Sequence, residues 1–505
     1  MSTTKAPSLF SAVALGVGSV VGSGWLFACY FAAKDAGPGA IASWIVCAFL
    51  NIFLAALLAE VAIMHPEKSL FSRLLSISHN QYMGFAIALA NWLTMIMLVP
   101  SEAAATVQYA STLYPNLTDY LYLNNKLTGL GMLTTDMLII LYGLVNYKGI
   151  GLLTKTNNII TTIKLVVPIG TALVILFSAF HPENFTLYRD SFVPYGADRV
   201  FTTIITSGMF YTFSCFYLVT VFAVELDNPR KNLPRALFLS VVFCLVMYIL
   251  LQIAFVGAVN PSSVAQGWHK LNFTSPLSQL AILLGLNWLA MVLYADATVS
   301  PSGAGIIYTA AATRMLNGMA DDHQAPKFFA KIDHKYHVSL RSLGFSLVLC
   351  MILVFFFDSW QKIMVASSVF ILLGALAIPI AFVRIRKDDL RERTFKVPLG
   401  KTISFFCFLL ISYLLVAGGT DALLVALIFE VAFFAFYIYN GKSLGHSSAS
   451  VAIKSSWSIF IYLLSLLLLA HLKLSMDKHL FLLIFAGLGV ITYYCLINQK
   501  GYSDR

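Results

Sequence analysis

The sequence predicts an all-α polytopic membrane protein, and three observations support this fold class. Hydrophobic residues make up 59% of the 505 residues, and charged residues make up only 11%. Apolar stretches of about 20 residues, each long enough to cross the hydrocarbon core of a bilayer, recur from one end of the chain to the other. The first of these stretches is interrupted by the small residues Gly22, Ser23 and Gly24, which indicates a broken membrane helix rather than a simple anchor.

Fourteen membrane-spanning helices are expected from the apolar stretches. The first stretch is too long for a cleavable signal peptide and lacks a small-residue cleavage site, so we expect it to stay in the protein as a helix. The expected spans cover residues 8–33, 38–63, 82–110, 132–148, 153–179, 200–224, 236–259, 278–312, 341–358, 361–384, 402–418, 421–440, 456–472 and 479–497.

The distribution of basic residues predicts that both termini lie in the cytoplasm. With the N-terminus inside, most of the 33 lysines and arginines fall in loops on its side of the membrane, where positive charge is enriched. They concentrate at 230–235, 314–341 and 384–401. The formal net charge of +10 therefore reflects topology and contact with anionic membrane lipid, and no nucleic-acid partner is expected.

The interruption of the first span is the first candidate substrate site. Each glycine lowers helix stability by about 1 kcal/mol relative to alanine, and hydrocarbon penalises any backbone N–H or C=O without a partner. In transporters with broken helices, the free N–H groups of the second half-helix face an anionic group such as a substrate carboxylate. The alternative is a packing site, because small residues also let neighbouring helices approach closely.

The sixth span carries a second interruption. Its centre, Ile205 to Tyr217, is rich in aromatic and hydroxyl side chains and contains Gly208. Interruptions in the first and sixth spans are what a five-plus-five inverted repeat predicts, with the site between the repeats. We therefore expect a first repeat at 1–200, a second at 201–384 and accessory helices at 385–505. An aromatic stripe packed against neighbouring helices is the alternative for any single phenylalanine in this span.

No catalytic constellation appears in the chain. There is no Walker A sequence, HExxH motif or nucleophile elbow, and the cytoplasmic loops are too short for a nucleotide-binding domain. The seven cysteines fall in expected spans without a CxxC pair, so we expect neither disulfides nor a metal site. No enzyme activity and no cofactor are predicted. Absence of a Thr-Val-Gly-Tyr-Gly filter also weakens a channel interpretation.

Several separated motifs resemble the amino acid-polyamine-organocation (APC) superfamily, over roughly residues 8 to 440. Part of the second half looks like the bacterial permease subgroup often named aspartate-proton symporters. The superfamily motifs are Gly22-Ser23-Gly24, Glu225-x-x-Asn228-Pro229-Arg230-Lys231-x-x-Pro234 and Thr313-Arg314 to Ala320 before Pro326. The subgroup motifs are Gly267-Trp268-His269, Asn272 to Pro276, Leu286 to Ala290 and Ala295 to Gly303.

The resemblance implies a LeuT-type core, with spans one to five and six to ten as inverted repeats and the later helices accessory. The amino-acid carboxylate would lie on the N–H groups of Ser23 and Gly24, and the ammonium on carbonyls of the sixth-span break. Cys215 stands where the family usually has glycine, and Tyr217 where several members have an acidic residue. The candidate substrate-binding residues are Val21, Gly22, Ser23, Gly24, Trp25, Phe210, Tyr211, Phe213, Ser214 and Cys215.

Lys164 and Asp296 are the candidate proton-coupling residues. Lys164 lies well inside the fifth expected span, where a lysine costs at least about 2.5 kcal/mol at the bilayer centre. Its sequence context looks like the fifth-span lysine that, in proton-coupled relatives, takes the place of a sodium ion between spans one, five and eight. A structural tether to carbonyls of the first span is the alternative for Lys164. Asp296 is equally consistent with a proton relay and with capping the irregularity at Pro301.

Four other acidic residues lie in or near expected spans. Glu102 follows Pro100 in the third span, where we expect it to face an outer vestibule. Glu430 lies in an accessory helix and is expected to pack against other helices. Glu60 and Glu225 lie near cytoplasmic ends, where a salt bridge would close an inner gate.

These features predict a secondary active amino acid transporter that works by alternating access, with proton-coupled uptake across a bacterial inner membrane. An amino acid exchanger is the first alternative, because the same fold performs both tasks, and a non-transporting amino acid sensor is the second. The identity of the amino acid stays open. The subgroup resemblance favours aspartate, whereas the shortage of basic side chains in the core favours a neutral substrate. The oligomeric state is not predicted.

Overall fold

The computed structural model describes residues 8–66, 70–113, 115–147, 151–222, 226–333, 338–441, 449–473 and 475–499. The first half of the chain contains α1 (Leu9–Val20), α2 (Gly24–Ala36), η1 (Gly37–Gly39), α3 (Ala40–Met64), α4 (Leu70–Ser78), α5 (Gln81–Leu113), α6 (Pro115–Leu121), α7 (Gly129–Tyr147), α8 (Gly151–Ser178) and η2 (Pro182–Phe185). Two short antiparallel strands, β1 (Tyr122–Leu123) and β2 (Lys126–Leu127), lie between α6 and α7, with Tyr122 opposite Leu127.

The second half is also helical. It contains α9 (Ala197–Thr206), α10 (Met209–Thr212), η3 (Phe216–Phe222), α11 (Pro229–Ala258), α12 (Pro261–Val264), η4 (Trp268–Lys270), α13 (Pro276–Leu283), α14 (Asn287–Asp321), η5 (Lys327–Ala330), α15 (Leu340–Phe356), α16 (Trp360–Asp388), α17 (Gly400–Ala417), α18 (Thr420–Tyr439), α19 (Ala449–Leu472) and α20 (Lys478–Asn498).

The all-α, multi-pass class is confirmed. Among the described residues, nine helices are long and apolar enough to cross a membrane, with Gly24–Met64 counted as one, and the bent pair that begins with α9 is a tenth candidate. α1, part of α8, and α15 are shorter apolar helices. The total of fourteen spans therefore stays a prediction. The expected eighth span begins too early, because Gly285 (φ +75°) separates α13 from α14 at a point where hydropathy alone shows no boundary.

Both expected helix breaks are present. Val21 is extended (φ −80°, ψ 98°) between α1 and α2. In the sixth span, the axis turns by 54° between Ala197–Thr206 and the segment that follows. Gly208 (φ +79°) and Cys215 (φ +73°) both adopt the left-handed region on either side of α10, where a residue with a Cβ is strained by about 1–2 kcal/mol. The glycine usual in the family at the position of Cys215 is explained by this backbone conformation.

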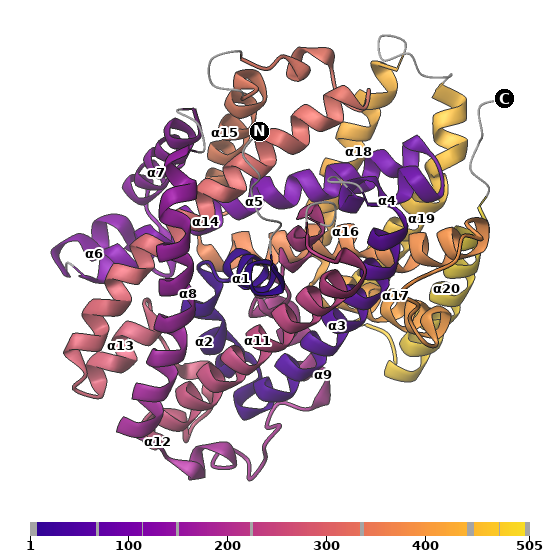
Figure 1. Ribbon diagram of the computed structural model, residues 1–505. Coiled ribbons are helices and arrows are strands. Elements are labelled where there is room, and N and C mark those ends of the chain that lie inside the picture. The colour runs from indigo at the N-terminus through magenta and orange to yellow at the C-terminus, as the bar shows by residue number, and fades with distance from the viewer. Residues whose placement is uncertain are drawn as a thin grey trace.

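The broken helices lie at the centre of the bundle, and the last helices lie on one flank (Figure 1). α5 is the innermost long helix, because its most apolar window is buried throughout and it packs most extensively against α14 and α16. α17 and α20 pack against α16, and α18 and α19 extend this layer. α5, α14 and α16 thus surround the two breaks, and the accessory helices stand outside them.

Candidate substrate site

The first break presents a backbone N–H to a carboxylate from another helix. The Ser23 N–H, at the start of α2, donates to Glu102 Oε2 of α5 at 2.7 Å. A Cβ built on Gly22 would lie 2.6 Å from Glu102 Oε1, so the glycine is what allows this close approach. The N-terminus of a helix stabilises a negative charge. The break therefore binds a carboxyl group, and this group belongs to the protein rather than to a substrate.

The position of Glu102 differs from the one predicted from the sequence. We expected this side chain to face an outer vestibule, but it is only 1% exposed and lies in the break itself. Its charge inside an apolar stretch was a detectable signal. Because α5 is buried on every side, however, no hydrophobic periodicity indicates the direction in which the side chain points.

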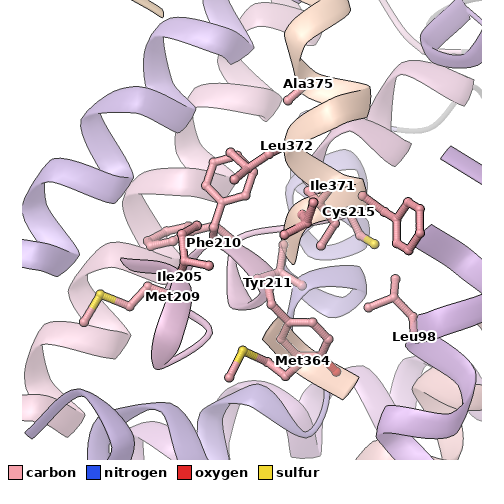
Figure 2. Packing of buried hydrophobic residues seen from close by; sticks show 14 of the residues in the cluster. Leu98, Ile205, Met209, Phe210, Tyr211, Cys215, Met364, Ile371, Leu372 and Ala375 are labelled. Atoms are coloured by element: carbon pink, nitrogen blue, oxygen red, sulfur yellow. The ribbon is translucent and has the colours of Figure 1, made fainter. Parts of the chain in front are cut away.

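Tyr211 connects the two breaks. Its hydroxyl donates to Glu102 Oε1 at 2.8 Å and lies 3.1 Å from Ser23 Oγ and 2.9 Å from Ser101 Oγ. Because the Tyr211 proton is committed to the carboxylate, Ser23 donates to Tyr211 Oη. The two breaks also touch directly, since a Cβ on Gly24 would lie 2.3 Å from Thr212 Cγ2. In Figure 2, the Tyr211 and Phe210 side chains leave α10 in different directions, and the Tyr211 ring lies on the side of Leu98.

Trp360, at the start of α16, covers this network. Its indole N–H donates to Ser23 Oγ at 2.9 Å. Its ring stacks on Phe27 (4.5 Å between centroids) and Phe31 (5.7 Å) and meets Tyr211 edge-on at 5.9 Å. Trp360 was not among the residues predicted from the sequence, because a tryptophan at the end of a span is ordinary in interfacial aromatic belts. We call Phe27, Phe31 and Trp360 the aromatic lid.

The other side of the breaks is closed as well. Ser19 Oγ lies 3.1 Å from the Cys215 carbonyl and 2.8 Å from the Gly16 carbonyl, so the end of α1 is bound to the sixth-span break. Tyr217 stacks face to face on Phe71 of α4 at 3.9 Å. The breaks therefore lie between two aromatic contacts, a lid on the α2 side and a stack on the α4 side.

The remaining candidate substrate-binding residues do not all point into one site. Val21 is fully buried in the first break, and Ser214 is 6% exposed beside Cys215. Phe213 instead packs edge-on against Trp44 of α3 (5.9 Å) and Tyr248 of α11 (5.5 Å). Phe213 therefore packs against neighbouring helices, as the alternative interpretation of a phenylalanine in this span predicts.

Lys164 joins α8 to the first broken helix. Its side chain is 2% exposed, and Nζ lies 3.4 Å from the Gly18 carbonyl near the end of α1. This is the tether that the sequence analysis set against a proton role. Glu102 and Asp296 act on the ammonium electrostatically, although no ion pair within 4 Å joins Lys164 to a carboxylate in the described part of the chain.

Only one carboxylate oxygen of Asp296, in α14, has a hydrogen-bond partner among the described residues. Oδ1 accepts a hydrogen bond from Ser300 Oγ at 2.7 Å, whereas Oδ2 has no hydrogen-bond partner among the described residues. Trp25 lies beside Asp296, and its indole N–H is likewise unpaired within the described chain. A buried donor and a buried acceptor thus lie next to each other at the start of α2. Trp25 is 1% exposed and Asp296 is 3% exposed.

A second buried carboxylate lies far from the breaks, at the end of α3. Arg386 donates to both oxygens of Glu60, Nε to Oε1 at 2.9 Å and Nη2 to Oε2 at 2.7 Å. Arg393 Nε is 3.1 Å from Oε1, and the Val397 N–H donates to Oε2 at 2.7 Å. We call Glu60, Arg386 and Arg393 the arginine cluster. Glu225, which we also expected near a cytoplasmic end, lies outside the described residues.

A helical membrane bundle in which two broken helices meet at an enclosed polar centre has the architecture of a secondary transporter. The comparisons with known proteins agree. Residues 8–441 match the family model described as "Amino acid permease", and the chain belongs to this family of the APC superfamily. It is a multi-pass membrane transporter of amino acids.

Curated relatives cover nearly the whole chain. The chain is 37% identical over 495 residues to the glutamate/serine transporter AimA of Bacillus subtilis (strain 168), covering 96% of this chain and 89% of the relative. It is 27% identical over 474 residues to an aspartate-proton symporter of the same organism, covering 93% and 90%. A D-serine/D-alanine/glycine transporter of Escherichia coli (strain K12) is 24% identical over 454 residues, covering 85% and 92%.

Proposed function

We propose that this protein takes up an amino acid together with a proton across a bacterial inner membrane by alternating access. The observation that carries the proposal is the Ser23 N–H, which holds a carboxylate at 2.7 Å in the first break. An amino acid supplies the same group, and its ammonium would bind carbonyls of the sixth-span break. Support for the substrate class comes from relatives whose names include glutamate, serine and aspartate.

The proposed site comprises the first break from Val21 to Trp25, Phe210 and Tyr211 of α10, and Ser214 and Cys215 after α10. In the proposed cycle, the aromatic lid opens to admit the amino acid, and the contact between Tyr217 and Phe71 opens to release it into the cytoplasm. Both termini would lie in the cytoplasm, and 1–200 and 201–384 would move against each other as inverted repeats.

Lys164 and Asp296 are proposed to support proton coupling from α8 and α14. Lys164 reaches the end of α1 through Gly18, so a change in its charge would alter how firmly the broken helix is held. We expect Lys164→Ala to lose proton-driven uptake while keeping part of its exchange of bound substrate. Proton-driven uptake at the wild-type rate in this variant would remove Lys164 from the mechanism.

Uptake into proteoliposomes tests the proposed function. The purified protein is reconstituted, and labelled glutamate, aspartate, serine and alanine are offered with and without an inward proton gradient, to empty and to amino acid-loaded vesicles. Accumulation in empty vesicles that collapses with a protonophore is the expected result. Uptake restricted to loaded vesicles and indifferent to the gradient would make the protein an exchanger instead.

A further inference from the structure

Glu102 occupies the place that a substrate carboxylate needs. The donors at this point are the Ser23 N–H, at 2.7 Å from Oε2, and the Tyr211 hydroxyl, at 2.8 Å from Oε1. Both are neutral hydrogen-bond donors, as expected of a site that binds an anion and then releases it. The side chain is 1% exposed, so water does not compete for these donors.

No permanent counter-ion fixes the charge of Glu102. Within the described residues, no lysine, arginine or histidine lies within 4 Å of its carboxylate. The titratable side chains that interact with its charge lie on several surrounding elements, and apart from Lys164 they are tyrosines and a cysteine, which are neutral near pH 7. They are Lys164 of α8, Tyr142 of α7, Tyr211 of α10, Cys215 after α10, Tyr248 of α11 and Tyr308 of α14. Asp296 of α14 faces Lys164.

Two carboxylates cannot share these donors. Like charges at hydrogen-bond distance in a buried site force one of the two groups to take up a proton or to leave. A substrate carboxylate that binds the Ser23 N–H removes the one backbone donor that Glu102 has among the described residues. A buried carboxylate deprived of its donors is strongly unfavourable, whereas the protonated acid needs only a single acceptor, and the Tyr211 hydroxyl oxygen supplies one once its own proton is free.

We propose that Glu102 acts as an internal substitute for the substrate in the empty transporter, and that it leaves the Ser23 N–H in protonated form when the amino acid binds. One proton from the outer solution adds to one carboxylate oxygen of Glu102 for each amino acid that enters. After the amino acid leaves toward the cytoplasm, Glu102 releases that proton on the same side and binds Ser23 again. This inference rests on the proposed function and assigns its coupling step to one residue.

The substitution Glu102→Gln separates these steps, because glutamine can accept from Ser23 but cannot take up a proton. Binding of labelled L-glutamate and L-serine to the purified full-length protein is measured across a pH series. For the wild type, we expect the dissociation constant to rise by about tenfold per pH unit on the alkaline side, because binding of the amino acid requires the uptake of one proton. For Glu102→Gln, we expect a dissociation constant that does not change with pH, and counterflow without proton-driven accumulation.

Glu430→Gln is the matched control, because it makes the same chemical change at a buried glutamate of α18. It should keep the wild-type pH dependence and accumulation. Unaltered pH dependence in Glu102→Gln would overturn the inference, and so would loss of binding at every pH in a folded variant, since that result makes Glu102 a direct ligand of the substrate. In either case, accumulation by the wild type would leave the proposed function intact. Absence of transport in the wild type would remove both.

An infrared difference spectrum of the wild type provides a test that does not depend on the folding of a variant. Addition of L-glutamate or L-serine should produce a carboxylic-acid C=O band, absent from Glu102→Gln and retained in Glu430→Gln. A wild-type spectrum in which substrate binding produces no such band would contradict protonation of Glu102.

Discussion

Glu60 and Glu102 are both glutamates buried to within 2% of complete exclusion from solvent, yet their surroundings differ in kind. Two arginines and a backbone N–H surround the Glu60 carboxylate. Glu102 is bound by a backbone N–H and a tyrosine hydroxyl, both neutral. Glu60 therefore has two permanently charged counter-ions, whereas the charge of Glu102 depends on whether its two neutral donors stay available. The same residue type thus forms a permanent ion pair at one site and at the other carries a charge that depends on two neutral donors.

The largest effect on stability is expected at the arginine cluster. Glu60→Ala leaves the partly buried guanidinium groups of Arg386 and Arg393 without their carboxylate, and removal of one partner from a buried ion pair costs about 3–5 kcal/mol. We expect a marked fall in the midpoint of thermal unfolding in detergent. A midpoint at the wild-type value would show that the ion pairs of Glu60 do not stabilise the fold, and would contradict the contrast drawn with Glu102.

Asp389→Ala is the control for that experiment. Asp389 bonds Arg391 through both carboxylate oxygens, and these hydrogen bonds hold the pKa of the Asp389 carboxyl well below its usual range. The Arg391 side chain is 62% exposed, however, and solvent-exposed ion pairs contribute about 0–1 kcal/mol. The midpoint of thermal unfolding of Asp389→Ala should therefore move much less than that of Glu60→Ala. Because the pKa of Asp389 is lowered, any contribution is present at neutral pH and is lost as the pH falls below the usual range of aspartate.

The next effect concerns Tyr211, which binds Glu102 without neutralising it. Tyr211→Phe leaves Glu102 Oε1 without a donor, and an unsatisfied buried acceptor costs about 1–3 kcal/mol. Loss of the donor disfavours the charged carboxylate, so the decline of substrate affinity should begin at a higher pH than in the wild type. A pH series of L-serine binding measures this shift. An unchanged profile would mean that Tyr211 only packs against the break.

A smaller effect is expected for the aromatic lid. Trp360→Phe keeps a ring over Phe27 but loses the hydrogen bond to Ser23 Oγ, which contributes about 0.5–1.5 kcal/mol. We expect faster substrate release, measured as a shorter lifetime of bound labelled amino acid after dilution. Trp360→Ala removes the stacking as well and should shorten the lifetime further. Equal lifetimes in Trp360→Phe and the wild type would show that stacking alone closes the lid.

Much of this architecture could be predicted from local sequence. Gly22 to Gly24 and Gly208 mark the two breaks because glycine weakens a helix wherever it stands, and Lys164 is conspicuous because a lysine inside an apolar stretch is costly. The partners of the first break could not be predicted in this way. Ser23 and Glu102 are 79 positions apart, and Ser23 and Trp360 are 337 positions apart. Only the packing of α5 and α16 around the break brings them together, and an all-round buried helix shows no periodicity that would reveal its contacts.

The smallest effect is expected at Glu430, which completes the comparison. This glutamate is 2% exposed, and neither of its oxygens has a hydrogen-bond partner in the described part of the chain. Where Glu60 has arginines and Glu102 has neutral donors, nothing described here binds a charge on Glu430. Glu430→Gln keeps the shape of the side chain and removes only its ability to ionise, so stability and uptake should both stay close to the wild type. Thermal unfolding and proteoliposome uptake measure the two quantities. A loss of proton-driven uptake here would mean that burial of a glutamate, rather than its position at the helix break, determines which residue couples to protons.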